Sequence, residues 1–214
     1  MRKIIISLAA ISLLACSCTT DPYTGEKKIS STAIYGGGGA LAGALVGQLA
    51  GKDTKSTLIG AAVGGAAGAG LGYYFDNQET KLRNELKGTG VGVKRTGDKI
   101  KLIMPGNITF ATNSSNINSS FYKVLNSVAK VFKEYKKTTI LINGYSDSIG
   151  DADKNQTLSL NRAQSVADYL TSQGIEAGRV RTDGLGASNP IASNDNESGR
   201  SQNRRVEIEI APAK

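Results

Sequence analysis

The sequence predicts an α+β fold, in which one mixed β-sheet covered by helices (residues 91–214) follows a glycine-rich helical hairpin (residues 33–75). Three observations lead to this prediction. Beyond residue 90, stretches that alternate apolar and polar residues are typical of strands. Between them lie stretches with an apolar residue every three or four positions, typical of helices. The 26 glycines are unevenly placed, and many repeat every four residues in two uncharged stretches.

The N-terminus has the pattern of a secretory signal peptide at residues 1–15. Two basic residues precede an apolar run of about 12 residues, which is too short to span a bilayer as a helix. The run ends in Leu-Leu-Ala before Cys16, which resembles the bacterial lipobox and predicts acylation of Cys16. Cys18 is a weaker acceptor, and a signal peptide cleaved without lipidation is the alternative. Residues 16–32 are then a lipidated polar linker, and Ser17 in place of an aspartate indicates the outer membrane.

The central segment, residues 33–75, carries two runs of regularly spaced glycines. A spacing of four places each run on nearly one helix face, where another helix can approach closely. The sequence therefore favours an inserted or oligomerising hairpin of the glycine-zipper type, and a flexible tether is the alternative. The eight glycines are Gly39, Gly43, Gly47, Gly51, Gly60, Gly64, Gly68 and Gly72.

A charged connector helix is predicted at residues 76–90, followed by the elements of the C-terminal domain. A Gly97-Asp98 turn within an alternating stretch predicts a β-hairpin. The order expected from there is β-hairpin, α, β, α, β, β, an arrangement of one sheet with helices on it. The ranges are hairpin 91–103, helix 121–135, strand 138–142, helix 155–172, and strands 179–182 and 205–210.

Composition excludes several classes of function. The chain has no histidine and only two cysteines, both near the N-terminus, so Ser-His or Cys-His catalysis and a zinc site are not expected. We expect no cofactor, no metal and no enzymatic activity. The formal charge is +8, and without Arg2 and Lys3 there remain 24 basic residues against 18 acidic ones. This charge suits an anionic partner, but no aromatic-basic stripe indicates nucleic acid.

Five blocks of the C-terminal half resemble the OmpA-like peptidoglycan-binding domain. They occur in order and at the separations of that family, across residues 91 to 211. Together with the glycine-rich segment, they make the whole chain similar to YiaD-type OmpA-family outer-membrane lipoproteins. The blocks are Phe110–Ile117, Asn143–Gly150, Asn155–Ala163, Gly184–Ala187 and Asn203–Ile208.

The resemblance implies a binding site for the diaminopimelate of the peptidoglycan stem peptide. In the family an aspartate and an arginine hold its ammonium and its carboxylate, and the matching residues are Asp147 and Arg162. Arginine suits this role because its fork can bind a carboxylate through two hydrogen bonds. Ala111 departs from the family, many members of which have an acid there. The family's other polar positions in the pocket match Asn113, Thr112 and Asn155.

Each of these residues also has a plain structural interpretation. Asp147 follows a strand, where an aspartate commonly makes a turn or caps a helix. Arg162 could be a solvated charge on a helix, and Asn155 a helix N-cap. Arg204 and Arg205 are interpreted as structural features of the last strand and are left out of the predicted site.

The sequence thus predicts a non-enzymatic lipoprotein, lipid-anchored in the outer membrane of a Gram-negative bacterium, with its C-terminal domain in the periplasm. Its partners would be peptidoglycan and, through the N-terminal lipid, the membrane. The alternative is an oligomeric membrane-embedded assembly or pore component, a homo-oligomer through the glycine-zipper segment, in which wall binding is only positional.

Overall fold

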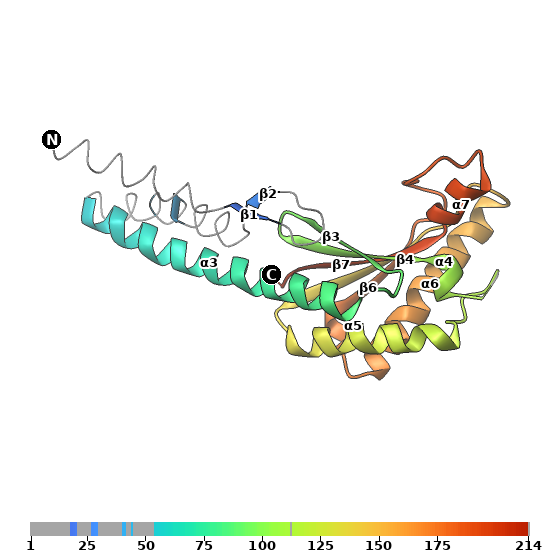
Figure 1. Ribbon diagram of the computed structural model, residues 1–214, viewed down its shortest axis with the longest axis horizontal. Coiled ribbons are helices and arrows are strands. Elements are labelled where there is room, and N and C mark those ends of the chain that lie inside the picture. Colours follow the sequence, from blue (N-terminus) through green and yellow to red (C-terminus); the bar gives the residue numbers. More distant parts are fainter. Residues whose placement is uncertain are drawn as a thin grey trace. The chain divides into compact units, whose positions relative to one another are not determined.

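The computed structural model describes residues 54–111 and 113–213, together with residues 18–20, 27–29, 40, 41 and 44 (Figure 1). The described residues form two compact units, Met1–Asn77 and Gln78–Lys214. The predicted site residues Cys16 and Thr112 lie outside the described residues. All four glycines of the first run also lie outside them, so the predicted hairpin stays a prediction.

The first unit contains a small two-stranded sheet and most of one long helix. Strands β1 (Cys18–Thr20) and β2 (Lys27–Ile29) pair antiparallel, within the segment predicted to be a linker. Helix α3 (Thr54–Glu85) contains the second glycine run. In the part of the chain that the structure describes, no helix combines the length and apolarity needed to cross a membrane.

Helix α3 corrects the prediction of a separate connector helix at residues 76–90. The helix runs without a break from Thr54 to Glu85, because residues 76–85 contain no proline or glycine that would stop it. It ends shortly before Gly88, which has a φ of 76°. The last two turns belong to the second unit, where Lys81 contacts Glu134, and Glu85 pairs with Lys130 at 2.8 Å.

A five-stranded mixed sheet is the centre of the second unit. Its strand order is β3-β4-β7-β5-β6, so the last strand in sequence lies in the middle. All neighbours are antiparallel except β5 and β6, which are parallel. The strands are β3 (Gly92–Thr96), β4 (Lys99–Pro105), β5 (Thr138–Gly144), β6 (Val180–Gly184) and β7 (Arg205–Pro212).

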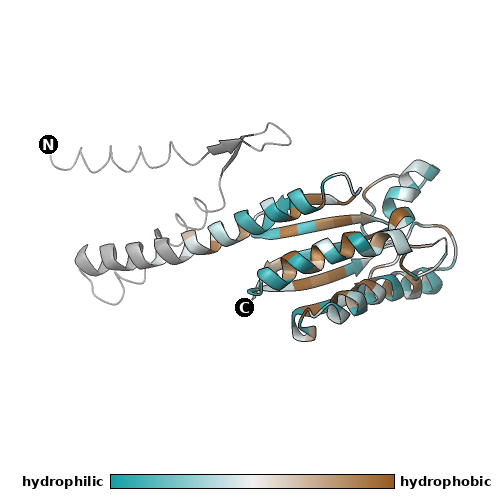
Figure 2. Ribbon diagram, turned by 60° about the horizontal axis from the view of Figure 1, so that its bottom comes forward, coloured by the Kyte–Doolittle hydropathy of each residue, from teal (hydrophilic) through white to brown (hydrophobic). Residues whose placement is uncertain are grey.

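Helices α5 (Tyr122–Glu134) and α6 (Ala152–Ser172) pack on the sheet and enclose the core. Apolar and polar residues alternate along the strands, and the helices carry apolar stripes (Figure 2). Both the α+β class and the predicted element order are confirmed. The largest fully buried side chains of this unit are Leu82, Ile100, Leu102, Met104, Leu125, Phe132, Ile140, Ile142, Leu170, Ile208 and Ile210.

Helix α6 lies unusually close to the sheet, because glycines face it on two strands. A Cβ atom added at Gly144 of β5 would lie 1.9 Å from the carbonyl oxygen of Ser159. At Gly184 of β6 it would lie 2.6 Å from the Cβ atom of Leu160. Only glycine permits this approach, which fixes the position of the middle of α6 relative to the strand ends.

The N-terminus of α6 lies three residues earlier than predicted. Asp151 is its N-cap, and the side chain accepts a hydrogen bond from the Lys154 N–H at 2.9 Å. Asn155 is therefore inside the helix, which excludes its interpretation as the N-cap. Instead its Nδ2 donates to the carbonyl of Ile149 at 2.9 Å and so holds the loop between β5 and α6.

Two short helices that the sequence analysis did not predict interrupt the second unit. Helix α4 (Gly106–Thr109) follows β4 directly. Helix α7 (Glu197–Asn203) precedes β7 and is capped by the Asn196 side chain, which accepts from the Gly199 N–H at 2.8 Å. The 3-10 turns are η1 (Ser119–Phe121) and η2 (Ala177–Arg179).

Arg179 connects the end of α5 to the start of β5. Its Nε donates to the Thr138 carbonyl at 2.9 Å. The terminal nitrogens donate to the carbonyls of Phe132 and Tyr135 at 3.0 and 2.9 Å, and one also donates to the Thr138 hydroxyl. One guanidinium thus donates hydrogen bonds to three main-chain carbonyls between the last turn of α5 and the first residue of β5.

We predict that Arg179→Ala lowers the free energy of unfolding by about 3 kcal/mol, because several charge-assisted hydrogen bonds to partly buried carbonyls are lost. Chemical denaturation of the full chain measures the change. Lys123→Ala on the exposed side of α5 is the control and should change it by less than about 0.5 kcal/mol. Equal effects of the two substitutions would contradict the role assigned to Arg179.

We also predict that Asp151→Ala lowers the free energy of unfolding by about 1 kcal/mol, since the first turn of α6 loses its cap. Asp151→Asn retains a capping oxygen and should remain within about 0.5 kcal/mol of the wild type. Thermal and chemical denaturation of the wild type and the two variants measure these free energies of unfolding. A neutral Asp151→Ala would show that the helix begins elsewhere.

Candidate functional site

A pocket of about 430 Å³ opens in the second unit, where the loop after β5 meets the first turns of α6. Residues 106–111 and Asn113 contribute a second wall, and Glu197 and Arg204 at the two ends of α7 contribute the third. Four of the five predicted pocket residues line it, and Thr112 is the one outside the described residues. The lining residues are Gly106, Asn107, Phe110, Ala111, Asn113, Ser146, Asp147, Ile149, Asn155, Leu158, Arg162, Glu197 and Arg204.

Arg162 is the most deeply placed charge of the pocket, with only 6% of its surface exposed. Its Nε donates to the carbonyl of Ser114 at 3.0 Å, and its guanidinium lies 5.2 Å from the centre of the Phe110 ring. These contacts orient the fork. Among the described residues, no hydrogen bond uses its two terminal nitrogens. This burial rules out a solvated helix charge and leaves a positioned guanidinium that can accept an anion.

The electrostatics of Arg162 favour an anionic ligand. Burial lowers its pKa and the nearby Arg204 lowers it further, whereas Asp147 raises it. An arginine keeps its proton in a protein, so these effects act as a cost of the buried charge and not as deprotonation. A ligand carboxylate would offset that cost.

Asp147 follows β5 and is largely buried, with 9% of its surface exposed. Its Oδ1 accepts from the Ile149 N–H at 3.1 Å, so the residue does make the turn that its position suggests. Its Oδ2 accepts from a terminal nitrogen of Arg204 at 2.6 Å. Asp147 thus combines a turn with a charged pair inside the pocket.

Arg204 is the pocket residue that the sequence analysis missed. It bridges two carboxylates, Asp147 at 2.6 Å and Glu197 at 2.5 Å. These hydrogen bonds raise the pKa of Arg204, and its contact lowers the pKa of Glu197. Glu197 is the first residue of α7 and Arg204 is its C-cap, seven residues or about two turns later, so the two side chains can meet on one side. That spacing was the available signal, but the glycine and serines of α7 concealed the helix.

Arg205, the neighbour of Arg204, lies away from the pocket in a buried polar cluster on β7. Its Nε donates to Glu207 at 2.7 Å, and its guanidinium stacks 3.8 Å from the centre of the Tyr145 ring. Glu207 also pairs with Lys101 at 2.7 Å. Burial raises the pKa of Tyr145, and the Glu207 charge acts in the same direction. The two adjacent arginines thus have different surroundings.

The remaining predicted residues shape the rim. Asn113 is exposed and has a φ of 51°, a left-handed conformation that asparagine tolerates. It lies in the loop closed by the bridge between Phe110 and Ile117, the same loop that supplies the Ser114 carbonyl. Ala111 is exposed at the rim, where it offers no side-chain hydrogen bond. The pocket therefore presents one inner carboxylate and two guanidiniums to a ligand.

Comparisons with known families agree with this architecture. Residues 109–204 match the OmpA family, and residues 1–76 match the YMGG-like Gly-zipper family. The chain is 49% identical to the probable lipoprotein YiaD of Escherichia coli over 99% of its own length and all of that protein.

Two further relatives are similar to the C-terminal half. The peptidoglycan-binding protein ArfA of Mycobacterium bovis is 40% identical over 52% of this chain and 34% of that protein. The solved structure of the cell wall anchor of the T6SS from Pseudomonas aeruginosa is 31% identical, with a TM-score of 0.56 over 63% of this chain and 96% of that one. Given the full-length match and the two matching segments, the chain belongs to the OmpA family and, within it, to the YiaD-type lipoproteins that carry a glycine-zipper segment before the OmpA domain.

Proposed function

We propose that this protein is a non-enzymatic outer-membrane lipoprotein that binds peptidoglycan through the diaminopimelate of the stem peptide and thereby tethers the outer membrane to the cell wall. The observation that carries the proposal is the juxtaposition of Asp147 and Arg162 in one pocket. The free end of diaminopimelate has an ammonium and a carboxylate on the same carbon. A pocket with one aspartate and one oriented arginine complements both groups.

The carboxylate of the ligand binds Arg162. The fork of this side chain is oriented by Ser114 and Phe110, and its terminal nitrogens face no acceptor among the described residues. Two parallel charge-assisted hydrogen bonds can form there without a change of rotamer. Because the guanidinium is already oriented, little of the interaction energy is lost to ordering it on binding. The ligand carboxylate also neutralises a buried charge.

The ammonium of the ligand binds Asp147 and competes with Arg204. Oδ2 of Asp147 is already paired with Arg204, so the ammonium either shares this carboxylate or displaces the arginine. Glu197 makes displacement inexpensive, because it retains Arg204 at the rim through the second ion pair. The Asp147 carboxylate thus has a cationic partner within the protein and can exchange it for the ammonium of the ligand.

This chemistry gives selectivity among wall polymers. A stem peptide with lysine in place of diaminopimelate retains the ammonium but lacks the carboxylate. Arg162 would then remain buried without an anion, an arrangement that costs binding energy. The relatives named as a peptidoglycan-binding protein and a cell wall anchor support wall polymer as the ligand class.

The second candidate is an oligomeric membrane-embedded assembly in which wall binding only positions the protein. It is favoured by the glycine repeat within α3 and by the match of residues 1–76 to the Gly-zipper family. In that case the glycine faces carry the function, and the pocket serves as an anchor.

We predict that Asp147→Asn and Arg162→Lys each weaken binding to diaminopimelate-type peptidoglycan by about tenfold or more, because each removes charge-assisted hydrogen bonds to one end of the zwitterion. Sedimentation of the full chain in detergent with purified sacculi measures binding. Asp153→Asn and Arg181→Lys, both outside the pocket, are the matched controls. Lysine-type sacculi should bind the wild type more weakly. Equal binding by all variants would exclude this pocket as the wall site.

We predict that Cys16→Ala transfers the protein from the membrane fraction to the periplasmic fraction, since acyl chains on that residue supply the membrane affinity. Fractionation of cells followed by immunoblotting tests this. Cys18→Ala is the control and should leave the distribution unchanged. If the Cys16→Ala protein stays with the membrane, the glycine-rich segment and not the lipid holds it there, which favours the second candidate.

A further inference from the structure

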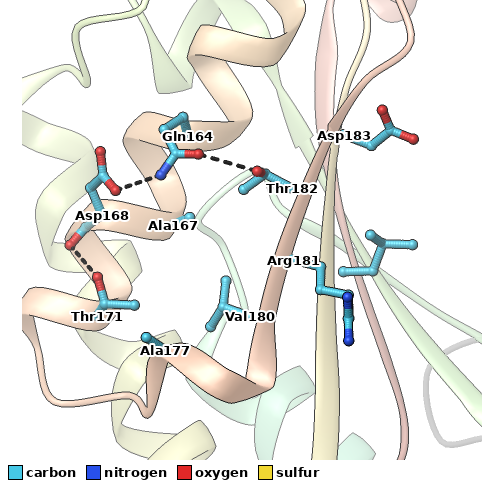
Figure 3. A pocket seen from close by; sticks show the side chains of 10 residues that line it. Gln164, Ala167, Asp168, Thr171, Ala177, Val180, Arg181, Thr182 and Asp183 are labelled. Carbon is cyan, nitrogen blue, oxygen red and sulfur yellow. Dashed lines mark hydrogen bonds between the residues drawn. The ribbon is translucent and has the colours of Figure 1, made fainter.

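The outer edge of β6 is an unused edge of the sheet. In the order β3-β4-β7-β5-β6 this strand pairs only with β5, and no other strand among the described residues lies beside it. A groove of about 540 Å³ runs along this edge between β6 and α6. Ala167 and Ala177 line the groove and leave room, and Val180 and Thr182 form its strand side (Figure 3).

The backbone of β6 presents hydrogen-bonding groups to this groove. The N–H of Leu185 donates to the carbonyl of Gly144 on β5. Because the main-chain N–H and C=O groups of every second residue point to the same side of a strand, those of Asp183 and Arg181 also face β5. The N–H and C=O of Thr182 and the C=O of Val180 consequently face the open edge, whereas the N–H of Val180 already donates to the carbonyl of Ala177. The carbonyl of Gly184 points the same way and accepts from Nε2 of Gln156, which closes that end of the edge. A new strand could therefore hydrogen-bond to both groups of Thr182 and to the carbonyl of Val180.

The uncharged side chains of β6 lie on one face of the sheet, and its charged side chains lie on the other. Val180 and Thr182 face α6, where the Thr182 hydroxyl donates to Oε1 of Gln164 at 3.1 Å. Arg181 and Asp183 lie on the opposite side of the strand and are exposed (Figure 3). Neither has a charged partner within 4 Å among the described residues. The edge therefore carries one positive and one negative charge, two residues apart.

We propose that the β6 edge binds the β6 edge of a second copy of this chain, in an antiparallel register centred on Thr182. In this register Thr182 pairs with Thr182 of the second copy, and its outward N–H and C=O groups make the hydrogen-bonded pair. Arg181 lies opposite Asp183 of the second copy, and Asp183 lies opposite its Arg181. Both are non-hydrogen-bonded pairs, in which side chains approach most closely. The result is one continuous ten-stranded sheet.

Charge complementarity singles out this occupant and this register. A parallel arrangement would place like charges side by side. An antiparallel register centred on residue 181 or 183 would place two arginines or two aspartates opposite each other, which is unfavourable. Charged residues on an edge strand usually disfavour pairing with another strand. In this register each charge lies opposite a charge of the other sign, which is favourable. A self-complementary strand is what a two-fold symmetric interface requires. The inference does not rest on wall binding, because neither Asp147 nor Arg162 lies on β6.

The test is disulfide cross-linking of the full chain in detergent at the symmetric position. In a Cys18→Ser background, Thr182→Cys places two thiols on a hydrogen-bonded pair with a Cα–Cα distance of about 5.5 Å, within the range that a disulfide spans. Lys94→Cys on β3, the other edge strand, is the matched control, and the Cys18→Ser parent controls for Cys16. We expect a covalent dimer for Thr182→Cys only.

Charge exchange then tests the register. Arg181→Asp in the Thr182→Cys chain should reduce dimer yield by about tenfold or more, because two attractive pairs become repulsive. The double variant Arg181→Asp/Asp183→Arg restores opposite charges and should restore the dimer, provided that melting curves show all variants folded. The proposal is overturned if Thr182→Cys gives no dimer or cross-links to a different protein. It is also overturned if Arg181→Asp leaves the yield unchanged, or if the folded double variant fails to recover it.

Discussion

The contact of α6 with the backbones of β5 and β6 is the constraint on which the site depends. At Gly144 and Gly184 the helix rests on the strands with no side chain between them, so its height above the sheet is set by backbone atoms. Side chains adjust by rotamer changes, whereas a backbone contact of this kind does not. Arg162 lies three residues beyond Ser159, so its position follows directly from this contact.

The rigidity of α6 explains how a charge can be buried at the base of the pocket. Arg162 loses water without gaining a carboxylate of its own, a state that a mobile segment would relieve by moving into solvent. Here the helix is fixed, and the Ser114 carbonyl and the Phe110 ring hold the guanidinium. The buried guanidinium is therefore placed where an anion would offset the cost of its charge. Asp147 differs from Arg162, because it has an oppositely charged partner within the protein, Arg204.

The main strands and helices of the second unit could be predicted because their signals are local. The turn at Gly97 and Asp98 fixes the β3–β4 hairpin, and the apolar stripe between Tyr122 and Glu134 fixes α5. Asp147 and Arg162 could be located only through the resemblance of the blocks around them. Spacing alone gave Asp147 the character of a turn residue, and the structure shows that it makes that turn as well.

The features that escaped prediction depend on long-range contacts or on weak local signals. Arg204 reaches Asp147 across 57 residues of sequence, a relation that no periodicity encodes. The break expected after residue 75 did not occur, because a change of composition from glycine-rich to charged need not interrupt a helix. The start of α6 was expected at Asn155, with a cap there as an alternative interpretation, although Asp151 has the same capping chemistry one turn earlier.

The central place of β7 has a consequence for the order in which the chain becomes functional. β4 and β5 do not contact each other in the sheet, and both pair with β7, the described strand that comes latest in the sequence. A chain that has been synthesised only as far as Arg204 has two disconnected strand pairs and no closed core. Arg204 itself directly precedes β7, so the pocket acquires its last wall in the same step. A chain cut short before β7 therefore lacks both the closed sheet and the complete pocket.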